Sequence, residues 1–205
     1  MAETAEARRE QLAALSHESQ TCTRCDLSQS RNTVVFGVGA PDADLMFIGE
    51  APGGEEDRLG VPFIGRSGRL LSRLLEDSGI SRDDVFITST LKCRPPGNRD
   101  PKSTETESCR PWLFEQIRLV EPRVVATLGN FATRLLSGNP AGITSVHGKV
   151  QVHTLGTRTV FLYPLFHPAA ALRSTGTSEL LRKDIEALPD LLTTELPGTQ
   201  GVGGP

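Results

Sequence analysis

Four short apolar segments, each running into a loop rich in glycine, proline or charge, constrain the fold of this chain more than any other feature. They occupy residues 44–48, 83–91, 123–129 and 159–167. Segments of this length are typical of strands buried within a sheet. A helix-like stretch follows each of them. These stretches are residues 67–79, residues 103–120, a short stretch that ends at residue 136, and residues 178–192. The alternation predicts an α/β fold in which helices cover both faces of a parallel sheet.

The helical stretches carry their own start and stop signals. Residues 67–79 place four leucines on one face, with Ser67 as a candidate N-cap and Gly79 as a stop. We expect a helix over the first 20 residues and a break near Pro111 in the helix 103–120. Residues 1–194 then form one domain, and residues 195–205 form a disordered tail.

Polar residues gather directly after three of the four predicted strands. They lie in the segments 50–57, 89–99 and 167–173. Ligands of parallel sheets bind beyond the carboxyl ends of the strands. The sequence therefore predicts a functional site built from these three loops.

The charge of the chain does not indicate a strongly basic nucleic-acid binder, because 22 Lys and Arg face 25 Asp and Glu. The acidic residues are concentrated at the two ends, and residues 21–173 carry a net charge of +2. Such a body is compatible with a DNA contact, although ordinary scatter of surface charge explains it as well. The sequence lacks the roughly 20 consecutive apolar residues of a membrane-spanning helix and an apolar signal segment in its first 20 residues. We therefore expect a cytoplasmic protein with no membrane partner.

Four cysteines need an explanation in such a protein, because disulfide scaffolds belong to exported proteins. Cys22 and Cys25 have C-x-x-C spacing, Cys93 lies in a predicted loop, and Cys109 lies on a predicted helix. Four thiolates could hold zinc or a [4Fe–4S] cluster, and the default role of such a centre is structural. A redox dithiol and four unrelated buried cysteines are the alternatives.

The run GEAPGGEED, the loop KCRPP, the four cysteines and the segment FHPAAALR together resemble the family 4 uracil-DNA glycosylases, the iron–sulfur type. The resemblance covers about residues 10–192. It implies a three-layer α/β/α sandwich around a four-stranded parallel sheet, with a structural [4Fe–4S] cluster on Cys22, Cys25, Cys93 and Cys109. It also implies a monomeric, monofunctional DNA glycosylase that flips a deaminated base, uracil above all, out of single- or double-stranded DNA. Hydrolysis of the N-glycosidic bond would then start base excision repair.

The resemblance also assigns roles to individual residues. Glu50 acts on the cationic sugar and the attacking water, and His167 donates to O2 of the departing base. The implied substrate-binding residues are Ala51, Gly53, Glu56, Phe63, which stacks on the base, and Ser89. The residues expected to contact DNA are Arg94, Arg99, Lys102, Leu172 and Arg173.

Two positions depart from the pattern of the family. Ser89 stands where relatives usually carry Asn, whose amide reads the edge of uracil, and Ala171 stands where most have a wedging Leu. A serine hydroxyl is shorter and both donates and accepts, so shifted or broadened specificity, for hypoxanthine, xanthine or another modified base, is an alternative. A non-catalytic DNA damage-binding protein is another. The loop between Cys93 and Cys109 lacks the basic, His-containing insertion of relatives that trap DNA covalently, so we expect no covalent capture.

Overall fold

The central strands alternate apolar side chains between the two faces of the sheet. In β2 (Leu45–Gly49), Leu45 and Phe47 pack into one apolar cluster, whereas Met46 and Ile48 pack into another on the opposite face. All residues of β2, β3 (Phe86–Ser89) and β4 (Val124–Leu128) are buried. This pattern is that of a sheet covered on both sides, as the sequence predicts.

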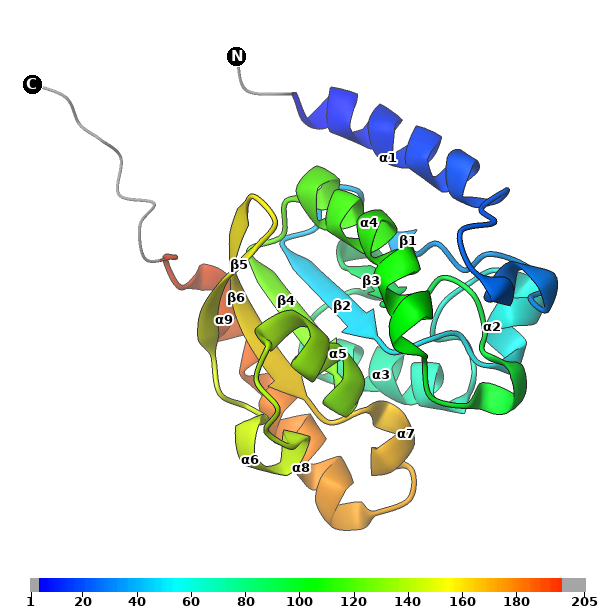
Figure 1. Ribbon diagram of the computed structural model, residues 1–205. Helices are drawn as coiled ribbons and strands as arrows, with labels where there is room; N and C mark the ends of the chain where they lie inside the picture. The colour runs from blue at the N-terminus through cyan, green and yellow to red at the C-terminus, as the bar shows by residue number, and fades with distance from the viewer. Residues whose placement is uncertain (1–3, 197–205) are drawn as a thin grey trace, which may run out of the picture.

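The computed structural model describes residues 4–196, and its central sheet has the strand order β1-β3-β2-β4-β6-β5 (Figure 1). The strands β3, β2, β4 and β6 (Arg158–Leu165) are mutually parallel, which confirms the predicted four-stranded parallel core. Two antiparallel edge strands that the sequence analysis missed, β1 (Val38–Gly39) and β5 (Gln151–Leu155), flank this core.

Helices form the two outer layers. One face of the sheet packs on α3 (Arg66–Asp77), α6 (Ile143–Val146), α7 (Pro168–Ala171), α8 (Thr175–Glu186) and α9 (Leu188–Thr193). The other face packs on α4 (Ser103–Val120) and α5 (Gly129–Ser137), and α1 (Ala5–Ser19) lies along the outer side of α4 (Figure 1). The short helix α2 (Gly54–Leu59) follows β2. The predicted three-layer architecture is therefore present.

Several predicted boundaries are wrong. The helix α4 runs through Pro111 without a break, although Pro111 has no N–H to donate within the helix. The predicted strand 83–91 is only Phe86–Ser89, because a 3-10 turn at Arg82–Asp84 precedes it. The predicted final helix is divided into α8 and α9, with a proline at the second position of α9. Most of the predicted tail, residues 197–205, lies outside the described residues. No helix within residues 4–196 is long and apolar enough to cross a bilayer.

Candidate active site

A cavity of about 450 Å³ opens at the carboxyl ends of β2, β3 and β6. All seven residues that the resemblance assigns to catalysis or base binding line it. They are Glu50, Ala51, Gly53, Glu56, Phe63, Ser89 and His167. These residues come from the segment between β2 and α3, from the last residue of β3 and from the segment after β6, and the edge of the parallel sheet brings them together.

His167 ends the segment after β6 and caps α7. Its Nδ1 accepts a hydrogen bond from the Ala169 backbone N–H at 3.1 Å. Burial lowers the pKa of His167 to about 4, against a smaller opposing effect of the Glu56 carboxylate. A neutral imidazole whose Nδ1 accepts carries its proton on Nε2. His167 therefore provides a neutral Nε2–H donor at physiological pH.

Glu50 follows β2 and lines two hollows at once, the cavity and a second depression that Asp100 and Asn130 border. Its backbone carbonyl accepts from the Leu91 N–H at 3.0 Å, which joins the loops after β2 and β3. Burial, and then the negative charge of Asp100, raise the pKa of the Glu50 carboxyl above its usual value. A partly desolvated carboxylate of this kind suits work as a general base or as a partner for developing positive charge.

Phe63 lines the cavity close to the end of β2. Its ring centroid is 5.6 Å from that of His167, with 33° between the ring planes. A Cβ on Gly49 would lie 2.6 Å from Cζ of Phe63, so only glycine at position 49 allows the ring to lie so close to the end of β2. Glu56 holds the same loop, because its Oε1 accepts the N–H groups of Ile64 and Gly65 at 3.2 and 3.0 Å.

The five residues predicted to contact DNA occupy different places. Arg99 and Arg173 line the cavity, and Leu172, which is 41% exposed, borders an adjoining hollow together with Arg173. Arg94 and Lys102 do not line the cavity. Arg94 donates from Nε to Asn98 Oδ1 at 2.7 Å, and Lys102 is the N-cap residue of α4. Arg99 also forms a bidentate ion pair with Glu105, at 2.9 and 2.5 Å.

Other residues of the cavity were not predicted from the sequence. Among them are Pro62, Ser67, Pro95, Asn98 and Ala169. Asn98 has a positive φ of 54° in the turn PGNR, a conformation for which the dipeptide Gly-Asn is the available signal. The others gave no signal, because their positions depend on how loops approach one another in three dimensions.

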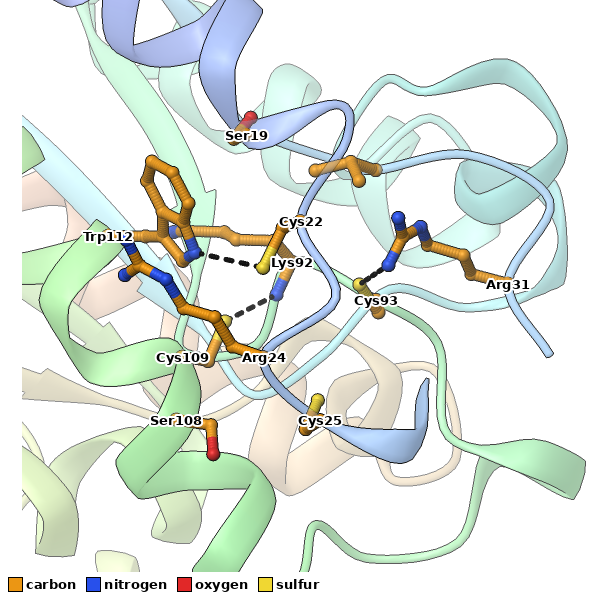
Figure 2. Close-up of a pocket in the computed structure, with 11 residues that line it drawn as sticks. Ser19, Cys22, Arg24, Cys25, Arg31, Lys92, Cys93, Ser108, Cys109 and Trp112 are labelled. Carbon is orange, nitrogen blue, oxygen red and sulfur yellow. Dashed lines mark hydrogen bonds between the residues drawn. The ribbon is translucent and has the colours of Figure 1, made fainter. Parts of the chain in front are cut away.

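The four cysteines, called here the cysteine cage, line a second pocket together with Trp112, Arg24 and Arg31 (Figure 2). All four are free thiols, and Cys93 and Cys109 are buried. Burial raises the pKa of the Cys93 thiol to about 11 and also raises the pKa values of Cys25 and Cys109. Unrelated cysteines would not meet in one place, so that alternative is wrong.

Each sulfur of the cysteine cage has its own N–H donor. Trp112 Nε1 donates to Cys22 at 3.4 Å, and Arg31 Nη1 donates to Cys93 at 3.5 Å. The Lys92 backbone N–H donates to Cys109 at 3.3 Å, and the Leu27 backbone bonds to Cys25. Such donors stabilise thiolates. N–H donors of this kind would support a group that the cysteines hold as thiolates.

The four thiols together could hold either of the groups that the sequence allows, zinc or a [4Fe–4S] cluster. No three His, Cys, Asp or Glu side chains in the described part of the chain converge closely enough to share one metal ion. Figure 2 shows the thiols arranged around a common space instead. A single zinc ion requires sulfurs about 2.3 Å from one centre, whereas in a cluster each thiolate binds its own iron. Four thiols that line one pocket supply the number of sulfur ligands that either a zinc ion or a [4Fe–4S] cluster takes.

Comparison with known proteins gives consistent matches. The family model of the uracil DNA glycosylase superfamily matches residues 36–191. A type-4 uracil-DNA glycosylase of Sulfurisphaera tokodaii is 39% identical over 188 residues, which cover 89% of this chain and 86% of that protein. The type-4 enzyme of Thermotoga maritima is 40% identical, over 92% of this chain and 98% of its own length. A type-5 uracil-DNA glycosylase of Pyrobaculum aerophilum is 33% identical, over 75% and 71%.

Proposed function

This chain belongs to the type-4 uracil-DNA glycosylases of the uracil DNA glycosylase superfamily, and we propose that it removes uracil from DNA by hydrolysis and so starts base excision repair. The observation that carries this proposal is the single cavity that joins Glu50, Phe63 and His167. The enzyme acts on DNA as a monomer in the cytoplasm and forms no covalent adduct with it.

Base flipping is the first step, because the N-glycosidic bond is inaccessible within a duplex. The extruded uracil stacks on Phe63, and Ser89 and the backbone of Ala51–Gly53 contact its edge. Stacking of a base on an aromatic ring contributes about 1–3 kcal/mol. Arg173 and Leu172, at the mouth of the cavity, support a role in holding the DNA strand from which the base has left.

Bond cleavage separates charge. The electron pair of the C1′–N1 bond leaves with the base, and the negative charge spreads onto O2 of uracil. His167 stabilises that charge through its neutral Nε2–H, as its Nδ1 contact supports. The sugar becomes an oxocarbenium ion, which the Glu50 carboxylate stabilises. Glu50 then takes a proton from the water whose oxygen bonds to C1′, which leaves an abasic site.

The cysteine cage holds a [4Fe–4S] cluster on Cys22, Cys25, Cys93 and Cys109. When bound, this cluster supplies a rigid cross-link between the segment after α1 and the loop and helix that follow β3. The four N–H donors to the four sulfurs support this assignment. Elemental analysis of the purified protein should give about four iron atoms per chain, and zinc without iron would overturn the assignment.

Uracil-containing oligonucleotides, single- and double-stranded, provide the test of the activity. Wild-type protein should leave strands that alkali cleaves at the uracil position. Glu50→Gln should lower the rate at least about 100-fold, in line with loss of general base catalysis. Glu179→Gln, at an exposed carboxylate of α8, is the matched control and should leave the rate unchanged. Alkali-resistant strands with wild-type protein in every context would contradict the proposal, and tight binding without base release would favour a damage-binding protein.

Ser89 supports a second candidate, a glycosylase with broadened base specificity. Its buried side chain lines the cavity, as Phe63 does, and its short hydroxyl both donates and accepts hydrogen bonds. A panel of oligonucleotides with hypoxanthine, xanthine and other modified bases tests this candidate. Excision of uracil alone would exclude it.

A further inference from the structure

The backbone that carries the stacking ring is strained. Phe63 has a φ of 51°, in the left-handed region that residues other than glycine rarely adopt. Gly68 lies directly against it, since a Cβ on Gly68 would stand 1.7 Å from the Phe63 carbonyl oxygen. A non-glycine residue keeps such a conformation only where its surroundings hold it there. The contacts of this peptide therefore identify what fixes the ring.

Arg82 supplies contacts on one side of this peptide. It lies in the 3-10 turn that precedes β3, 19 residues from Phe63 in the sequence. Its Nη2 donates to the carbonyl oxygens of Pro62 and Phe63 at 2.9 and 3.1 Å, and its Nη1 donates to Ser72 Oγ on α3 at 2.9 Å. The guanidinium is planar and rigid, so three bonds fix the two carbonyls relative to α3.

Glu56 supplies contacts on the other side. Its carboxylate accepts the N–H groups of the two residues that follow Phe63. Arg82 thus holds the carbonyls of the peptide groups on both sides of Phe63, and Glu56 holds the N–H of the second of these groups and that of the next one. Glu56 lines the cavity, whereas Arg82 does not. Arg82 can therefore affect a bound base only indirectly, through the position of Phe63.

We propose that Arg82 is a positioning residue for base recognition. Its hydrogen bonds hold the Phe63 ring in the position in which a flipped uracil can stack on it. This inference rests on the proposed stacking role of Phe63. The ring has little freedom to move the other way, because Gly49 lies directly behind it. Without the Arg82 hydrogen bonds, the backbone of Phe63 can relax from its left-handed conformation. The ring then tilts into the space that the base would occupy.

Inhibition by free uracil measures base binding apart from DNA binding. Arg82→Gln should raise the inhibition constant of free uracil about tenfold, since part of a stacking contact is lost. Arg82→Lys keeps the charge but not the fork, and should recover part of this loss. Arg123→Gln is the matched control, because Arg123 also donates to a backbone carbonyl, that of Thr194 at 2.8 Å, far from the cavity. It should leave uracil inhibition unchanged.

A double-mutant cycle with Phe63→Leu separates positioning from a general structural effect. If Arg82 acts through the ring, Arg82→Gln should change the inhibition constant less than about twofold once Phe63 is leucine. Equal effects of Arg82→Gln in both backgrounds would overturn the proposal, as would an unchanged constant in Arg82→Gln. If Arg82→Gln does not fold, the same cycle is made with Arg82→Lys. If wild-type protein excises uracil in the same assay, the proposed function holds even where the double-mutant cycle contradicts the role of Arg82.

Discussion

Glu50 and His167 line one cavity. The proposed mechanism needs a neutral imidazole at His167 and an ionised carboxylate at Glu50. Burial keeps His167 neutral at physiological pH, with a pKa of about 4, and its Nδ1 contact places the proton on Nε2. The same kind of burial, together with the negative charge of Asp100, raises the pKa of the Glu50 carboxyl, so its carboxylate is a stronger base than an exposed one. A neutral donor and an anionic base can thus act together without exchanging a proton first.

The pH dependence of the rate should report Glu50 alone. Because the ionised carboxylate is the active form, kcat should rise with pH through the raised pKa of Glu50 and then level off. His167 adds no limb above pH 5, since its pKa is about 4. Single-turnover rates measured between pH 4.5 and 8, in steps of about one pH unit, test this prediction. An acidic limb that survives in Glu50→Gln would show that another group is responsible.

Ser89 should determine how firmly the enzyme holds uracil. Ser89→Asn introduces an amide that donates and accepts at once, so kcat/KM for uracil should rise several-fold while activity on purine lesions falls. Ser89→Ala, which only removes the hydroxyl, is the paired variant and should lower kcat/KM for uracil. Competition between uracil and hypoxanthine oligonucleotides measures both. Equal behaviour of the asparagine and alanine variants would argue that position 89 does not read the base.

At the scale of elements, one ion pair organises the loop between the third and fourth cysteines. The Glu105 carboxylate, buried at the start of α4, accepts from the Arg99 guanidinium and from the Lys102 backbone N–H at 2.8 Å. We predicted Arg99 to contact DNA, and that role stays a prediction. Its bidentate bond to Glu105 gives it a second task, which is to shape the rim of the cavity.

Glu105→Gln should make the protein less stable at neutral pH. The Arg99 hydrogen bonds hold the pKa of Glu105 below its usual value. The stability that the carboxylate contributes is therefore complete above its unfolded pKa of about 4.3 and is lost as pH falls through the lower folded value. The Tm difference between wild type and variant should be constant from pH 7 to 5 and narrow below about pH 4.

Glu115→Gln is the control for this prediction. Glu115 pairs with Arg118 at 2.8 Å on the exposed side of the same helix, and such surface pairs contribute about 0–1 kcal/mol. Its Tm should stay close to that of wild type. A Tm loss in Glu105→Gln that grows as pH falls would show that the ionised form of Glu105 is not the one that stabilises the protein.

The sequence predicts elements well where burial and periodicity agree. The strands β2 and β4 are recognisable because every residue is apolar or small and both faces are covered. The edge strands were missed for opposite reasons. β1 has only two residues, one of them Gly39, and β5 alternates exposed and half-buried side chains. Pairing with a neighbour, rather than the local sequence, makes these segments strands.

The candidate site divides in the same way. Glu50 and His167 could be predicted because they lie in motifs directly after strands, and Phe63 because the family resemblance covers its segment. Arg82 could not, because nothing in its own segment indicates that its guanidinium reaches back to the carbonyls of residues 62 and 63. Contacts made by tertiary approach leave no local pattern for sequence analysis to find.

At the scale of the whole molecule, the cysteine cage joins parts of the chain that are distant in sequence. Cys22 and Cys25 follow α1, Cys93 follows β3, and Cys109 lies on α4. The fully buried Lys92 connects the cage to the cavity, because its Nζ donates to the Ser89 carbonyl at 2.6 Å. A cluster in the cage would therefore stabilise both the N-terminal segment and the end of β3 that lines the cavity.

Cys109→Ser should lose iron and lower the Tm, because a structural centre contributes its binding free energy to folding. Ser108→Ala is the matched control, since Ser108 lines the same pocket but carries no thiol. It should keep its iron and its Tm. Iron content and thermal unfolding of both variants check this prediction. Full iron content in Cys109→Ser would contradict the proposed set of ligands.

We propose that this chain hydrolyses the bond between uracil and deoxyribose. Mass spectrometry of a single-stranded oligonucleotide with one uracil tests it most directly, because it identifies both products at once. We predict free uracil and an intact abasic strand in equal amounts, with no protein–DNA adduct. A strand of unchanged mass, a strand cut without alkali, or a covalent adduct would contradict the account.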